Sequence, residues 1–126
     1  MVLNKAQFVS KIANTIVSSD RQKIVLTVGC GGSHAIASHF SAELVGTFMN
    51  KERKAYPSIS LFSDPTITSA ISNDFSFEKI GQRFLDSFAK TALMLVAFTT
   101  SGKSQVIVNS LNFASQNDIP TFLITG

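Results

Sequence analysis

The sequence predicts an α/β fold, a three-layer sandwich in which helices cover both faces of a central parallel sheet. Short apolar runs alternate along the chain with segments whose apolar residues recur at every fourth position. The short runs are apolar on successive residues, which is typical of parallel strands buried on both faces. Their alternation with helices favours a doubly wound, flavodoxin-like sheet, and we expect residues 1–126 to form a single domain.

Two helices and a strand are predicted in the first half of the chain. Apolar spacing predicts helices over residues 4–18 and 33–49, and the β-branched run 24–28 between them predicts a buried strand. Ser33 stands where a cap of the second helix is expected. The apolar stripe of that helix is Ile36, Phe40, Leu44 and Phe48.

The second half continues the alternation. A strand over residues 58–62 precedes Asp64 and Pro65, which suit the cap and first turn of a short helix ending near residue 72. A further helix carries Ile80, Phe84 and Phe88, and the very apolar run 92–98 predicts a central strand. A helix with Ile107, Leu111 and Ala114 follows, and after the stop at Asn117 and Asp118 a last strand covers residues 122–124.

Composition excludes several classes of protein. With 44% hydrophobic and 15% charged residues, the chain is too apolar to be disordered. The net charge is +3 and the basic residues are scattered, so we expect no nucleic-acid partner. Lys51, Arg53 and Lys54 are interpreted as a solvated turn, with a patch that binds phosphate or an acidic partner as the alternative. The N-terminal segment has no long apolar stretch, which indicates no membrane partner. One cysteine, Cys30, permits no internal disulfide, and we expect a cytoplasmic protein.

Two loops after predicted strands are candidates for a phosphate site. Gly29–Ser33 leaves one strand and opens a helix, where backbone N–H groups and the helix dipole favour an anion. Its alternative role is a tight turn that requires glycine. Thr99–Ser104 places the hydroxyls of Thr99, Thr100, Ser101 and Ser104 around Gly102, with helix capping by Ser101 as the alternative. Ligands of such sheets bind at the carboxyl ends of the strands.

Two nucleotide-binding motifs fail on spacing. Gly102–Ser104 looks like the end of a P-loop, but Ala97 stands where that motif requires its first glycine. The dinucleotide fingerprint that begins at Gly29 requires glycine at the position of His34. ATP and NAD are therefore not expected ligands.

The helix after the first loop carries the candidate chemistry. His39 and Glu43 are four residues apart, which puts both side chains on one helix face within reach of one metal ion or substrate, or makes them a solvent-facing pair. His34 is either a polar first-turn residue or catalytic. Cys30 is either a small turn residue or a reactive thiol.

These segments together resemble the phosphoheptose isomerases, which are built on the sugar isomerase (SIS) domain. GCGGSHAIASHFSAELVG resembles that family's GNGGS and H-F-x-x-E-L-x-G elements, and FTTSGKS resembles its STSGNS phosphate loop. Between them, Tyr56, Pro57, Ser63, Asp64 and the segment AISNDFSF match further family elements. The resemblance covers roughly residues 23–126.

The resemblance implies an aldose–ketose isomerase that converts sedoheptulose 7-phosphate to D-glycero-D-manno-heptose 7-phosphate through an enediol, early in lipopolysaccharide heptose synthesis. It implies zinc as cofactor, with His39 and Glu43 as ligands and Glu43 as general base. It also implies a homo-oligomer, a tetramer in the family. The implied phosphosugar contacts are Cys30, Gly31, Gly32, Ser33, Asn73, Asp74, Thr99, Thr100, Ser101 and Ser104.

Some family features are not found in residues 1–126. The family pattern continues past its fourth strand to a Gln and a second His that complete the zinc site, and it has a longer N-terminal helix; we therefore expect a chain truncated at both ends relative to the family. Cys30 replaces an Asn of the family's first loop. Whether residues 1–126 are an enzyme stays open, and the alternatives are an inactive phosphosugar-binding module or an interaction protein like the replication-initiator-associating SIS proteins.

Overall fold

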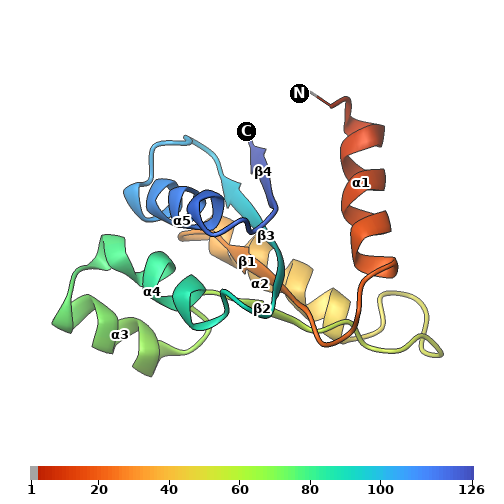
Figure 1. Cartoon of the computed structure of the whole chain (residues 1–126), viewed down its shortest axis with the longest axis horizontal. Helices are drawn as coiled ribbons and strands as arrows, with labels where there is room; N and C mark the ends of the chain where they lie inside the picture. The colour runs from red at the N-terminus through yellow and green to blue at the C-terminus, as the bar shows by residue number, and fades with distance from the viewer. Residues whose placement is uncertain (1–2) are drawn as a thin grey trace.

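The computed structural model describes residues 3–126, and its helices and strands alternate as expected (Figure 1). The strands are β1 (Ile24–Val28), β2 (Ser58–Ser60), β3 (Ala92–Thr99) and β4 (Thr121–Thr125). The helices are α1 (Lys5–Val17), α2 (Gly32–Val45), α3 (Pro65–Asp74), α4 (Ile80–Ser87) and α5 (Gln105–Gln116), with a 3₁₀ turn η1 (Phe77–Lys79) before α4. The predicted α/β class and parallel sheet are confirmed.

The four strands form one parallel sheet in the order β2-β1-β3-β4. From β1 the chain proceeds to β2 on one side, and β3 then starts on the other side of β1. The loops that follow β1 and β3 therefore diverge at a topological switch point, which is where ligands bind in open α/β sheets.

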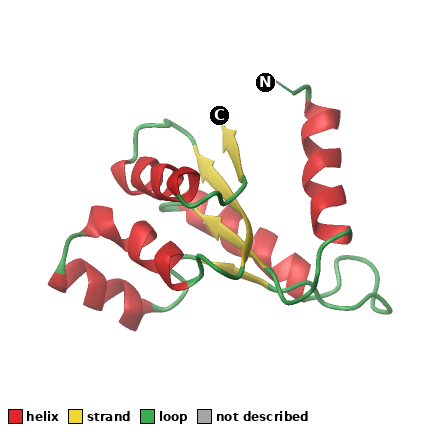
Figure 2. Cartoon of the chain, viewed as in Figure 1, coloured by secondary structure: helices red, strands yellow, loops and turns green. Residues whose placement is uncertain are grey.

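Helices cover both faces of the sheet, as Figure 2 shows. Side chains of β3 alternate between the faces: Met94 and Val96 join a cluster with α1 and α2, whereas Leu95 and Ala97 join a cluster with α4 and α5. All four are fully buried. Because β3 is apolar on both faces, its run has no polar alternation, as the sequence indicated.

Local signals explain several helix ends. The Asp64 carboxylate accepts hydrogen bonds from the backbone N–H groups of Thr66 and Ile67 at 2.8 and 3.1 Å, and Pro65 opens α3 as predicted. Helix α5 ends at Gln116, and Asp118 has a φ of 55°, a conformation that cannot continue a helix.

Helix α2 differs from its prediction at both ends. Gly31, with a φ of 59°, occupies the N-cap position, so the predicted cap Ser33 lies inside the first turn and makes no capping bond. The helix ends at Val45 rather than at residue 49, because Phe48 and Met49 have φ values of 26° and 62°. Strand β2 is also shorter than predicted, and Phe62 beyond it has a φ of 76°.

The predicted apolar stripe of α2 is only partly the buried face. Phe40 and Leu44 pack against the core at half-buried positions, but Ile36 is 57% exposed and Phe48 is 62% exposed. The residues that α2 buries fully are the small ones, Ala37 and Ser41. Small side chains let the helix approach the sheet closely, and this close approach is not visible in the apolar spacing.

Candidate functional site

The loop between β1 and α2 is shaped by its glycines. A Cβ on Gly29 would lie 2.3 Å from the backbone oxygen of Ser33, so only glycine fits there. At Gly31 and Gly32, by contrast, a Cβ would meet nothing within 4 Å. Ser33 and His34 donate their N–H groups to the carbonyls of Cys30 and Gly31. Among residues 3–126 no hydrogen bond is found for the N–H groups of Gly31 and Gly32, which lie at the start of a helix, where N–H groups favour an anion.

The loop between β3 and α5 is held by its own hydroxyls. The Thr99 hydroxyl accepts from the N–H of Gly102, and the Ser101 hydroxyl accepts from the N–H of Lys103, each at 3.2 Å. Gly102 has a φ of 67°, and a Cβ on it would also reach open space. The alternative that Ser101 caps the following helix is wrong, because α5 begins at Gln105 with Ser104 at the N-cap position.

The two loops meet at the switch point of the sheet. The Ser104 hydroxyl donates to the Sγ of Cys30 at 3.7 Å, which joins residues 74 positions apart in the sequence. Ser104 makes no side-chain capping bond to its own helix. The Ser104–Cys30 contact therefore places the end of the hydroxyl loop against the glycine loop.

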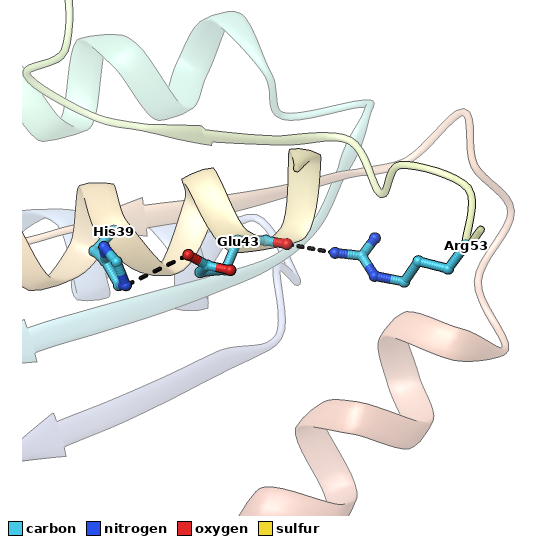
Figure 3. A network of polar contacts seen from close by, with 3 residues as sticks. All are labelled: His39, Glu43 and Arg53. Carbon is cyan, nitrogen blue, oxygen red and sulfur yellow. Dashed lines mark hydrogen bonds and ion pairs between the residues drawn. The ribbon is translucent and has the colours of Figure 1, made fainter. Parts of the chain in front are cut away.

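The His39 and Glu43 side chains contact each other on the exposed side of α2. His39 Nε2 lies 3.5 Å from Glu43 Oε1, and the two side chains are 78% and 37% exposed (Figure 3). Helix geometry places Glu43 almost above His39, so one ion or substrate group could contact both. This geometry is compatible with a solvent-facing pair as well as with a ligand pair.

Arg53 is a residue whose role the sequence reading missed. Its guanidinium donates to the backbone oxygen of Glu43 at the C-terminal end of α2 (Figure 3). It also donates to the backbone oxygen of Leu44. The reading of this residue as part of a solvated turn is wrong, since Arg53 is half-buried and also lies over the Tyr56 ring, 5.4 Å from its centroid. A basic residue shortly after a helix is a known partner for the last carbonyls, and this signal could have found it.

His39 and Glu43 supply two donors of the types that zinc prefers, an imidazole nitrogen and a carboxylate oxygen. Within the described range 3–126, no group of three or more His, Cys, Asp or Glu side chains could hold a metal ion. A zinc ion at this pair therefore requires further ligands from outside this range or from another chain. The His34 ring makes other contacts: its Nε2 lies 3.3 Å from Ser38 Oγ, and the ring packs edge-on against Phe62.

Asn73 and Asp74 were expected to contact the phosphosugar together with the two loops that meet at Cys30 and Ser104. Both are exposed at the end of α3, where the Asn73 amide donates to the Asp74 carboxylate at 3.1 Å. In the part of the chain that the structure describes, no hydrogen bond links them to Cys30 or Ser104. Asp74 instead borders a cavity of about 450 Å³ between α3 and α4, next to Phe75 and Arg83. Their assignment to the phosphosugar site stays a prediction.

Two features indicate the class of protein: the parallel sheet and the two loops that meet at its switch point. The SIS domain model matches residues 2–126, and the chain belongs to the SIS domain family. Its relatives within that family include phosphoheptose isomerases. That of Haemophilus ducreyi is 36% identical over 121 residues, covering 95% of this chain and 61% of that protein. That of Syntrophotalea carbinolica is 41% identical over 102 residues, covering 81% and 52% respectively.

Solved structures of phosphoheptose isomerases are also similar to this chain. A phosphoheptose isomerase from Francisella tularensis superimposes with a TM-score of 0.79 at 28% identity, over 94% of this chain and 62% of that one. A phosphoheptose isomerase from Neisseria gonorrhoeae gives 0.75 at 26% identity, with the same coverage. The chain thus spans between about half and about three fifths of the length of these relatives. None of the helices within residues 3–126 has the length and apolar character needed to cross a bilayer.

Proposed function

We propose that this chain binds a phosphosugar at the switch point of its sheet and contributes to sedoheptulose 7-phosphate isomerisation. The Ser104–Cys30 contact carries the proposal, because it brings the glycine loop and the hydroxyl loop to one place. The phosphate would accept from the N–H groups of Gly31 and Gly32 and from hydroxyls of Thr100, Ser101 and Ser104. The relatives named phosphoheptose isomerase support this substrate class.

The same helix links phosphate binding to the chemistry. With a rise of about 1.5 Å per residue, His39 lies about 10 Å along α2 from its first residue, Gly32. This separation suits a sugar whose phosphate is at one end and whose carbonyl is at the other. Glu43 would move the proton between the adjacent carbons as general base, and His39 would contact the neighbouring oxygens.

Zinc is proposed as the cofactor, with His39 and Glu43 as two of its ligands. Bound there, zinc would supply a positive charge that stabilises the enediolate oxygens. The remaining ligands and the general acid would come from outside residues 1–126. For this reason, catalysis is proposed for the whole protein and phosphosugar binding for this domain.

Two measurements test the proposal separately. Sedoheptulose 7-phosphate should raise the melting temperature of the chain, because a ligand that binds only the folded state stabilises it. Turnover of the full-length protein with added zinc should be lost in Glu43→Gln and kept in Glu52→Gln, an equivalent change in the exposed loop after α2. Stabilisation without turnover would support the inactive binding module instead. Absence of both would contradict the proposal.

We also propose a cytoplasmic homo-oligomer that acts in heptose synthesis for lipopolysaccharide. Val45 at the end of α2 and Phe48 and Met49 just beyond it are exposed. A groove of about 390 Å³ beside them is lined by Phe40, Leu44, Phe48 and Tyr56, and also by His39, Glu43 and Arg53. An apolar surface of this kind is typical of an interface. Light scattering should give a mass of at least twice the 13.6 kDa of one chain. A monomeric mass at all concentrations would contradict the proposed oligomer.

A further inference from the structure

Helix α2 is fixed to the sheet through hydroxyl groups. Its two buried positions are Ala37, with no exposed surface, and Ser41, which is 6% exposed. Neither offers a large apolar side chain to hold the helix in one rotational setting. Phe40 and Leu44 pack only at the side of the helix, at half-buried positions.

Three hydroxyls form a chain of hydrogen bonds under α2. Ser58 Oγ on β2 lies 2.9 Å from Ser41 Oγ, which in turn lies 2.9 Å from Thr27 Oγ1 on β1. Thr27 donates its proton to the Ala37 carbonyl at 3.0 Å. Since that proton is used, Ser41 must donate to Thr27. The single proton of the Ser58 hydroxyl has two acceptors within reach, Ser41 Oγ and the Val25 carbonyl at 3.0 Å, so the link to β2 is shared. Ser41 thus bonds α2 firmly to β1 through Thr27 and touches β2 through Ser58.

The position of Ser41 on the helix links this anchor to the proposed site. Each residue turns the helix by about 100°, so His39 and Glu43, two residues to either side, point about 160° away from Ser41. A rotation of α2 by about 10° would move a side-chain tip, about 5–6 Å from the axis, by about 1 Å. Displacements of this size can reduce a reaction rate by orders of magnitude.

We propose that Ser41 is a positioning residue, which sets the rotation of α2 and so the place of the His39–Glu43 pair relative to the glycine loop. The inference rests on the proposed isomerase function. Ser41 touches no substrate in this scheme. It acts through Thr27 and Ser58, so its removal should impair the chemical step more than phosphosugar binding at the helix start.

The chain offers a matched control. Ser110 on α5 is also fully buried, and its hydroxyl donates to the carbonyl of Val106 within its own helix at 2.6 Å. Ser110→Ala therefore removes a buried hydroxyl without cutting a link between a helix and the sheet. A further variant, Thr27→Val, removes the other hydroxyl of the Thr27–Ser41 hydrogen bond and keeps the branched shape of the side chain.

We expect Ser41→Ala to lower kcat for sedoheptulose 7-phosphate about tenfold with KM changed by less than about twofold, while Ser110→Ala leaves kcat within about twofold of the wild type. Thr27→Val should resemble Ser41→Ala. The double variant should lose less than the two single losses multiplied together, because both changes remove the same Thr27–Ser41 hydrogen bond. Equal effects of Ser41→Ala and Ser110→Ala, or losses that multiply in the double variant, would overturn the inference.

Amide hydrogen exchange gives a second readout that does not need turnover. Exchange across residues 38–45 should rise about fivefold in Ser41→Ala and stay at the wild-type rate in Ser110→Ala. A wild-type protein without turnover, assayed with zinc and at full length, would contradict the proposed function by itself. In that case unchanged exchange in Ser41→Ala would also overturn the anchoring role, and faster exchange limited to α2 would support it.

Discussion

Gly29→Ala is expected to be among the more damaging single-methyl changes in this chain. The added Cβ would lie 2.3 Å from the oxygen and 2.4 Å from the carbon of the Ser33 carbonyl, and 2.7 Å from the His34 nitrogen. All three are backbone atoms of the first turn of α2, so no side chain can rotate away. Either β1 or α2 must move, and both carry the proposed site.

The magnitude follows from the cost of overpacking. Forcing an extra methyl group into a packed region costs about 1–3 kcal/mol, and contact with backbone only puts this case at the upper end, about 3 kcal/mol. For a domain of 126 residues each kcal/mol lowers the melting temperature by about 4 °C, so we expect a decrease of about 12 °C. Calorimetry or circular dichroism would measure it.

Gly32→Ala is the control for Gly29→Ala, because it adds the same methyl group close by in the chain, at the first residue of α2. A Cβ there meets nothing within 4 Å, and Gly32 is the first residue of α2, where alanine is favoured over glycine by up to about 1 kcal/mol. Its melting temperature should equal or exceed that of the wild type. Stabilisation by sedoheptulose 7-phosphate should nevertheless be lost, because the methyl group would occupy the proposed phosphate site. A Gly29→Ala variant that melts within about 2 °C of the wild type would refute the reasoning.

Three further changes test other parts of the structure. Asp64→Ala should lower the free energy of unfolding by about 1 kcal/mol, measured in urea, because two backbone N–H groups of α3 lose their acceptor; an unchanged urea midpoint would contradict the capping role. Gly81→Ala should lower the free energy of unfolding, because its Cβ would lie 1.8 Å from the Ser110 hydroxyl. Adding Ser110→Ala should restore part of the lost stability, and no recovery would mean that the clash lies elsewhere. Alkylation of Cys30 by iodoacetamide should slow when sedoheptulose 7-phosphate is present and not when the unphosphorylated sugar is present, whereas equal rates would place the phosphate away from this loop.

Much of the fold could be predicted because the signals are local. The strand 92–98 was recognisable from its continuous apolar run, and Asp64 followed by Pro65 marked the start of α3. The sequence predicted helix α2, but it placed the C-terminal end at residue 49 instead of Val45 and identified only part of the buried face. The apolar spacing does not reveal that Phe48 lies beyond the helix, or that Ala37 and Ser41 make the close contacts.

The sequence predicted candidate residues for the site, and the structure brings only some of them into contact. Both glycine- and hydroxyl-rich loops were evident from the sequence, because each directly follows a buried strand. The role of Arg53 was missed because its partners are backbone carbonyls of α2, and its position shortly after the helix is the only sequence signal for this role. Asn73 and Asp74 were assigned by resemblance, and their place in a site is still to be measured.

The sequence by itself determined the alternation of strands and helices, the glycine and hydroxyl loops, and the four-residue spacing of His39 and Glu43. These follow from short-range chemistry: backbone conformation, apolar periodicity and helix geometry. Only the tertiary structure decided that Cys30 meets Ser104, and that Thr27, Ser41 and Ser58 connect α2 to the sheet. The order of the strands brings these residues together, and that order depends on how distant segments pack, which no local pattern of the chain specifies.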